Sequence, residues 1–167
     1  MQIRIEKETD ETDVRLVNTS AFEATTYADL VDALRKHARP VVSLVAEVDD
    51  SVVGHIMFSP VTLSGHPELK VSGLAPLAVA PGHQRAGIGS ALVRAGLEQC
   101  KQLGFVAATV LGHPEYYPRF GFTPSSRFGI DSEYDAPENA FMVLEIQPGA
   151  LNEVNGTVKY HNVFNSL

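Results

Sequence analysis

Two kinds of hydrophobic pattern recur along this chain of 167 residues, and they predict both strands and helices. Apolar runs rich in β-branched residues predict strands at residues 2–5, 41–48, 52–63, 74–80, 105–111 and 140–146. Apolar residues at helical spacing predict a short helix between Asp10 and Phe22, a second helix over residues 27–37, and a third from residue 89 to near Gly104. The chain is therefore expected to form a mixed α and β fold.

The first two helices have recognisable starts and apolar stripes. Thr9 or Asp10 can cap the first helix, and Thr26 can cap the second. The apolar residues expected to pack are Val14, Leu16, Val17 and Phe22 in the first helix and Leu30, Val31 and Leu34 in the second.

A strand, a glycine-rich turn, a helix and a second strand follow one another between residues 74 and 111. This order predicts a βαβ crossover, which places the start of the helix at the carboxyl end of the first strand. Gly87 and Gly89 lack the Cβ atoms that would block close approach, so successive backbone N–H groups could face a phosphate. The turn is therefore a candidate anion site.

Two common phosphate sites do not fit this turn. A nucleotide P-loop needs a lysine before its Ser or Thr, but residues 87–90 read Gly-Ile-Gly-Ser. A dinucleotide fingerprint needs a third glycine, and Leu92 stands there instead. What remains is the pattern Gln84-x-x-Gly87-x-Gly89 after a strand.

This pattern and two further features resemble the GCN5-related N-acetyltransferase superfamily. In that superfamily the Gln-x-x-Gly-x-Gly turn binds the pyrophosphate of acetyl-coenzyme A. Pro76 interrupts the first strand of the crossover, where a bulge or splay is expected because proline cannot donate to a ladder. Residues 116–122 read Tyr-Tyr-Pro-Arg-Phe-Gly-Phe, similar to the superfamily segment whose functional tyrosine falls at Tyr117.

The resemblance implies a complete fold and a binding site. The fold is α+β with three layers, in which a mixed, mostly antiparallel sheet splays between its fourth and fifth strands and carries helices on both faces. Residues 1–167 would form a single N-acetyltransferase domain. The residues expected to bind acetyl-CoA are Leu77, Ala78, Val79, Gln84, Arg85, Ala86, Gly87, Ile88, Gly89, Ser90, Tyr116 and Arg119.

The resemblance extends to the end of the chain. Residues 110–122, the run from 139 to 146 and the late segments 148–151 and 156–160 are similar to a bacterial subgroup of predicted N-acetyltransferases, the YhbS-like proteins. The acceptors of this subgroup are poorly defined, so the acceptor, the acyl-chain preference and the choice between monomer and homodimer stay open.

An N-acetyltransferase needs a neutral amine, an oxyanion donor and a donor for the leaving thiolate. The resemblance assigns the thiolate donor to Tyr117, and a strand amide such as that of Val79 could stabilise the oxyanion. The central strand offers no glutamate as a base. The candidates for the general base are Glu47, His55, Glu68, His113 or a chain of water molecules.

Composition and charge limit the kinds of molecule that the protein is expected to bind. The net charge of −7 without a Lys/Arg cluster argues against nucleic acid and anionic membranes. A single cysteine, Cys100, and a charged amino-terminal segment indicate a cytoplasmic protein. The histidines have no metal-ligand spacing, so no metal is expected.

Two other functions compete with an acetyltransferase that uses acetyl-CoA and an amine. A non-catalytic acyl-CoA sensor would keep the glycine turn and the splayed strands, but it would not need a polar group at position 117. A purely structural domain would have no use for two close-approach glycines after a proline-interrupted strand. Tyr117 therefore favours the enzyme over both alternatives.

Overall fold

One sheet runs through the molecule in the computed structural model, which describes residues 1–166. The described strands are β1 (Gln2–Ile5), β2 (Val42–Val48), β3 (Ser51–Leu63), β4 (Val71–Val79), β5 (Ala107–Leu111), β6 (Thr123–Pro124), β7 (Ile130–Ser132), β8 (Phe141–Glu145) and β9 (Gly156–Lys159). Their order is β1-β2-β3-β4-β5-β8-β6, and β9 pairs with both β3 and β7 away from this path. Neighbours are antiparallel except for the parallel pairs β4–β5 and β7–β9.

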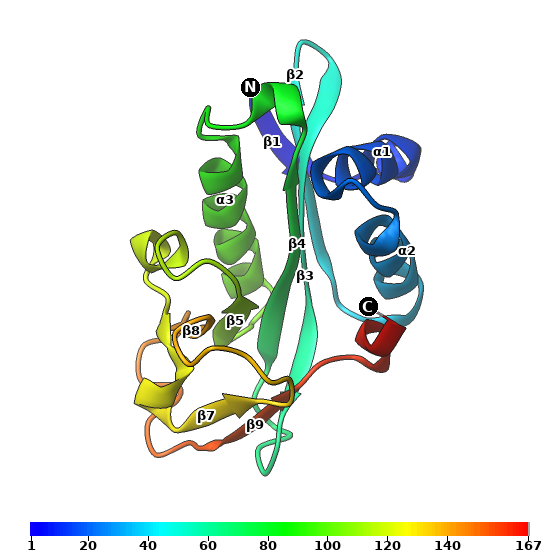
Figure 1. Cartoon of the computed structure of the whole chain (residues 1–167). Helices are drawn as coiled ribbons and strands as arrows, with labels where there is room; N and C mark the ends of the chain where they lie inside the picture. The colour runs from blue at the N-terminus through cyan, green and yellow to red at the C-terminus, as the bar shows by residue number, and fades with distance from the viewer. Residues whose placement is uncertain (167) are drawn as a thin grey trace.

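Helices cover both faces of the sheet. The α-helices are α1 (Glu11–Phe22), α2 (Thr26–His37) and α3 (Ile88–Gln102), and the short 3-10 turns are η1 (Glu8–Asp10), η2 (Pro81–His83), η3 (Tyr117–Phe120), η4 (Ser125–Phe128) and η5 (Asn162–Ser166). Helix α3 lies on one face, and α1 and α2 lie on the other (Figure 1). The mixed sheet between two helical layers confirms the predicted fold class.

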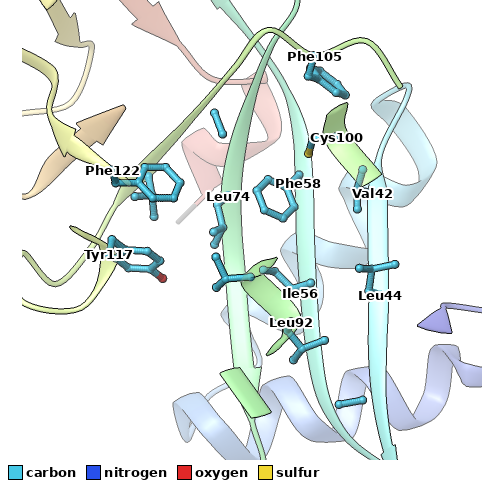
Figure 2. Packing of buried hydrophobic residues seen from close by; sticks show 14 of the residues in the cluster. Val42, Leu44, Ile56, Phe58, Leu74, Leu92, Cys100, Phe105, Tyr117 and Phe122 are labelled. Atoms are coloured by element: carbon cyan, nitrogen blue, oxygen red, sulfur yellow. The ribbon is translucent and has the colours of Figure 1, made fainter. Parts of the chain in front are cut away.

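Side chains alternate between the two faces of β3, so this strand packs against the helices on both sides of the sheet. Ile56 and Phe58 pack against α3 residues such as Leu92 (Figure 2), whereas Met57 packs against Leu34 of α2. A third apolar cluster fills the end of the molecule where β7 and β9 lie.

The parallel pairing of β4 and β5 stops halfway along β4. It runs from Val71 opposite Ala107 to Leu74 opposite Val110, while β4 continues to Val79. On the other edge of β4, the register with β3 shifts so that Ala75 and Pro76 together oppose Met57, which is a β-bulge. The interruption expected at Pro76 is therefore present, and the two strands diverge beyond it.

Most predicted elements form with small shifts at their ends. The strand predicted at 74–80 begins at Val71, because Val71 already pairs with β5, and the strand predicted at 105–111 begins at Ala107. The β2–β3 hairpin turns through Asp49 and Asp50, which both have positive φ.

The expected helix starts and apolar stripes need correction at three places. Thr26 is already helical, and Thr25 takes the cap position without a side-chain cap. Leu16 is 60% exposed and Phe22 is 37% exposed, because helix α1 rests on the sheet through Val14 and Val17 instead. Asp10 accepts a hydrogen bond from the Lys7 amide at 2.7 Å and thereby closes the turn that precedes α1.

Candidate active site

A cavity of about 920 Å³ opens where β4 and β5 diverge. Its wall comes from the second half of β4, the start of α3, the end of β5, the segment around η3 and the junction of α1 with α2. The predicted site residues on this wall are Leu77, Val79, Gln84, Arg85, Gly87, Ile88, Gly89, Ser90, Tyr116, Tyr117 and Arg119. Ala78 and Ala86 are not among the lining residues; the Ala78 side chain is buried in the sheet.

The start of α3 is shaped by backbone geometry that glycine provides. Gly87 precedes the helix with φ of +83°, a left-handed conformation that disfavours other residues. Gly89 leaves space beside Tyr116, because a Cβ atom there would stand 3.2 Å from the Tyr116 hydroxyl oxygen. The first turn of α3 therefore presents its N–H groups to the cavity with few side-chain atoms in the way.

Gln84 connects this turn to β4. Its Nε2 donates a hydrogen bond of 3.0 Å to the carbonyl oxygen of Val79, on the edge that β5 has left. Arg85 follows with a positive φ of 63° and turns the chain toward α3. The glutamine therefore positions the turn on the sheet.

The open edge of β4 carries backbone amides that face the cavity side. The amide of Ala80 donates to Val53 of the β3 side at 2.8 Å, and successive N–H groups of a strand point to opposite edges. The amides of Leu77 and Val79 therefore point toward the edge from which β5 has diverged.

Tyr117 lies at the first position of η3, between the core and the cavity. The residue is 7% exposed, and its ring packs edge-on against Phe122, with the ring centroids 5.8 Å apart. A Cβ atom on Gly112 would lie 2.5 Å from the Tyr117 ring, so only glycine at position 112 leaves room for this ring. The hydroxyl oxygen points away from Phe122 (Figure 2). Burial, helped by the neighbouring Tyr116, raises the pKa of Tyr117 to about 12.

Tyr116 and Arg119 stand at the helix end of the cavity. The hydroxyl groups of Tyr116 and Ser90 lie 3.1 Å apart, which connects η3 to the first turn of α3. The Arg119 guanidinium lies 4.5 Å from the centre of the Tyr116 ring, and its Nε donates to the Tyr116 carbonyl oxygen at 2.9 Å. Arg119 is exposed and offers positive charge beside the start of α3.

The candidate bases occupy very different places. Among Glu47, His55, Glu68 and His113, only His113 lines the cavity. Glu47 forms an ion pair with Arg4 at 3.2 Å, and the exposed Glu68 lies 3.5 Å from His66.

His55 is fully buried under α1 within a chain of polar contacts. Its Nδ1 lies 3.1 Å from the Asn18 side-chain nitrogen, and its Nε2 lies 2.9 Å from the Ser43 hydroxyl, which donates to Glu6 at 3.0 Å. Desolvation, together with the positive charge of Arg35, lowers the pKa of His55 to about 3. The neutral imidazole therefore serves as a satisfied core residue.

Phe22, Tyr27 and Leu111 line the cavity although no sequence pattern marked them as site residues. Phe22 and Leu111 looked like ordinary core positions, and their exposure of 37% and 46% was the property that the sequence did not reveal. Gly112 was also missed, although its place between Leu111 and His113 directly precedes the tyrosine segment.

No group of three or more His, Cys, Asp or Glu side chains suited to a metal occurs within residues 1–166, and no helix in that range is long and apolar enough to cross a membrane.

This geometry agrees with a match between the chain and a known protein family. Residues 6–122 match the model of the acetyltransferase (GNAT) family. The chain belongs to this family. The uncharacterized N-acetyltransferase YhbS of Escherichia coli K12 is 36% identical to it over 166 residues, which are 99% of each chain. YjhQ of the same organism, also an uncharacterized N-acetyltransferase, is 41% identical over 138 residues, or 80% of this chain and 76% of that protein.

Solved structures of GNAT family members share the fold. The crystal structure of YhbS from E. coli in complex with CoA superposes with a TM-score of 0.92 at 35% identity and covers 98% of this chain and 91% of that one. A GNAT family acetyltransferase from Brucella melitensis in complex with acetyl-CoA gives a TM-score of 0.81 at 36% identity, with coverage of 98% and 97%. The resemblance found in the sequence, including the YhbS-like subgroup, is thereby confirmed.

Proposed function

We propose that this protein is an N-acetyltransferase that transfers the acetyl group of acetyl-CoA directly to an amine. The observation that carries the proposal is a single cavity bordered by both the start of α3 and the splayed edge of β4. Membership of the GNAT family and the named complexes of two relatives with CoA and acetyl-CoA support it.

The two ends of the coenzyme would use two kinds of backbone donor. The pyrophosphate would bind the N–H groups of residues 85–90, where the dipole of α3 and the glycines favour an anion. Arg85 and Arg119 would add positive charge at this end. The pantetheine arm would then pair with the open edge of β4 at Leu77 and Val79, as an added strand would.

The reaction would need no covalent intermediate on the protein. The neutral amine nitrogen attacks the thioester carbonyl carbon, a C–N bond forms, and the C–S bond breaks as the electron pair leaves with sulfur. A backbone amide of the open β4 edge that the pantetheine arm leaves free would stabilise the charge that develops on the carbonyl oxygen. The amine releases its extra proton, and the thiolate accepts a hydrogen bond or a proton.

We propose that the Tyr117 hydroxyl group donates the hydrogen bond to the departing sulfur. With a pKa raised to about 12, its phenol stays protonated throughout the neutral range and is always available as a donor. Complete transfer of that proton to a thiolate, whose ordinary pKa is about 8.5, would cost roughly 5 kcal/mol. Tyr117 would therefore act through a hydrogen bond that strengthens as negative charge builds on sulfur.

We propose that the proton released by the amine is accepted by His113 or by water molecules that His113 orients. His113 is the candidate base that lines the cavity, it lies beyond the end of β5, and a neutral imidazole has one nitrogen that can accept a proton. His55 is a poor base for this purpose because its buried ring is hydrogen-bonded inside the protein.

The proposal extends to the whole chain and its setting. We propose that residues 1–167 form one N-acetyltransferase domain, since the described sheet is continuous from β1 through β9. The buried thiol of Cys100 suits a reducing compartment such as the cytoplasm. Dimer formation stays a prediction from the sequence.

Thiol release from acetyl-CoA by the full-length protein tests the function. The panel should include polyamines, apolar amines, amino acids, aminoglycosides and basic peptides, with acetyl-CoA affinity measured separately by calorimetry. We expect amine-dependent thiol release and an acetylated product by mass spectrometry. A protein that binds acetyl-CoA but acetylates nothing in the panel would instead support the sensor.

A further inference from the structure

The cavity has two ends of different chemistry. The helix end carries His83, Gln84, Arg85, Ser90 and Arg119 and suits phosphate groups. The opposite end lies where the α1–α2 junction approaches the end of β5. It is lined by Phe22, Tyr27, Ala75, Leu111 and His113. Tyr117 and the open edge of β4 lie on the same wall, so an amine that meets a thioester there would use the second end.

This second end is aromatic and apolar. The rings of Phe22 and Tyr27 pack with centroids 4.3 Å apart and planes tilted by 34°. Phe22 and Leu111 are two of the few large apolar side chains that remain exposed within residues 1–166. A ligand with an apolar body would remove these surfaces from water and gain binding free energy, whereas a polar ligand would not.

No acidic side chain in the described part of the chain lines the second end; the exposed Glu23 and Glu115 adjoin lining residues in the sequence but do not line the cavity themselves. Within residues 1–166, the side chains that line this cavity include no Asp or Glu, and the ionisable groups at this end are Tyr27 and His113. The acids of the nearby helix α2 are already occupied, since Arg15 pairs with Asp29 at 2.7 Å and with Asp32 at 2.9 Å. A second ammonium group on an acceptor would therefore enter the cavity without a counter-ion, which is unfavourable.

We propose that the acceptor is a primary monoamine carried on an aromatic or bulky apolar body, as in the arylalkylamines. This inference rests on the proposed function and adds the substrate class. The aromatic body would pack on Phe22, Tyr27 and Leu111, which directs its single amine toward the open edge of β4. The net charge of −7 points the other way, toward cationic acceptors, but that charge lies outside the cavity.

A matched set of amines tests the inference by steady-state thiol release. The probes are 2-phenylethylamine, ethanolamine, which lacks the apolar body, and spermidine, which adds charge. We expect kcat/KM for 2-phenylethylamine to exceed the values for both others by at least about tenfold, the discrimination that an apolar pocket provides. Equal or better turnover of ethanolamine or spermidine would overturn the inference.

Variants of helix α1 test whether the preference for 2-phenylethylamine comes from this end of the cavity. Phe22→Ala should raise the KM for 2-phenylethylamine about tenfold and leave the Kd of acetyl-CoA unchanged. Leu16→Ala is the matched control, because Leu16 is an exposed apolar residue of the same helix that is not among the lining residues. Phe22→Asp should shift the kcat/KM ratio toward spermidine, since it supplies the missing carboxylate.

The outcomes separate this inference from the proposed function. If spermidine, an aminoglycoside or a lysine peptide is the preferred acceptor, or if Phe22→Ala and Leu16→Ala behave alike, the substrate class is wrong and the acetyltransferase assignment stands. If acetyl-CoA binds but no amine of any class releases thiol, the proposed function fails, and the inference fails with it.

Discussion

Tyr117 occupies a position where packing and chemistry constrain the same side chain. Its ring fills a space that Gly112 leaves open and that Phe122 closes, while its hydroxyl group stays on the cavity side. A tyrosine held in this way has few alternative rotamers, so its hydroxyl is positioned before the coenzyme binds.

The substitution Tyr117→Phe keeps the ring and removes the donor. We expect turnover to fall by roughly 10- to 1000-fold, the range for losing one acid or charge-stabilising group, while the Kd of acetyl-CoA changes by no more than about threefold. Single-turnover kinetics with the true acceptor checks this, with thermal unfolding as the control for packing. Unchanged turnover, with chemistry shown to be rate-limiting, would make Tyr117 a packing residue.

His55 predicts how stability depends on pH. Its pKa is lowered to about 3 in the folded protein and is about 6.5 when unfolded, so the unfolded chain binds more protons between these values. The stability contributed by the neutral ring is present above pH 6.5 and is lost as the pH falls toward 3. Between pH 7 and 4.5 this single group should remove about 2 kcal/mol from the free energy of unfolding.

Urea unfolding of the parent protein and of His55→Gln at pH 7 and pH 4.5 measures this effect. The variant is less stable at neutral pH because contacts to Asn18 and Ser43 change, so only the difference between the two pH values matters. The pH dependence of the variant should be weaker than that of the parent. Parallel pH profiles would show that His55 is not held neutral.

At the scale of elements, the first turn of α3 and the second half of β4 form one unit through Gln84. The hydrogen bond from Gln84 to Val79 fixes the turn to the strand, so the two sets of backbone donors keep a constant spacing. A coenzyme that binds both would gain from this fixed geometry, because little chain must be ordered on binding.

The substitution Gly89→Val should weaken coenzyme binding while the fold survives. Its Cβ atom would lie 3.2 Å from the Tyr116 hydroxyl and 3.8 Å from the side chains of Leu77 and Val79, which crowds the start of α3. We expect the Kd of acetyl-CoA, measured by calorimetry, to rise at least about tenfold.

Gly82→Ala is the matched control for that variant. A Cβ atom on Gly82 meets nothing within 4 Å, and the residue lies in η2, a few positions before the turn. This change should leave the affinity as it is. Unaltered affinity in a folded Gly89→Val protein would remove the phosphate assignment from residues 85–90.

At the scale of the whole molecule, the cavity joins segments that are far apart in the sequence. Its wall includes Phe22 near the amino terminus and Arg119 near the end of the family match. A ligand bound there would stabilise the folded state of the molecule as a unit, because it contacts both helical layers and the sheet between them.

Acetyl-CoA should therefore raise the melting temperature. At a concentration of 100 times its Kd, a ligand that binds only the folded state adds about 2.7 kcal/mol, which corresponds to roughly 5–10 °C for a chain of this size. Thermal unfolding with and without acetyl-CoA measures the shift. For Gly89→Val at the same ligand concentration, a tenfold weaker Kd should reduce the shift to about half, and equal shifts in both proteins would place the coenzyme elsewhere.

The sequence alone determined most of the elements and the glycine turn that borders the cavity. Strand and helix periodicity, the order of the crossover, the glycines at 87 and 89 and the interruption at Pro76 are local properties of the chain. The predicted elements form with small shifts at their ends, and the glycine turn and the interruption form where they were expected. Local backbone chemistry specifies them because a turn, a helix start or a bulge involves only neighbouring residues and one partner strand.

Only the tertiary structure decided which side chains face the cavity. His113 and His55 are the same residue type, yet one lines the cavity and the other is buried beside Asn18, which lies 37 positions away in the sequence. Glu47 is occupied by Arg4 from a strand 43 positions earlier, and Phe22 is exposed because helix α1 rests on the sheet through other residues. Burial, charge pairing and exposure arise from contacts between distant segments, and one residue pattern is compatible with several such arrangements until the chain has folded.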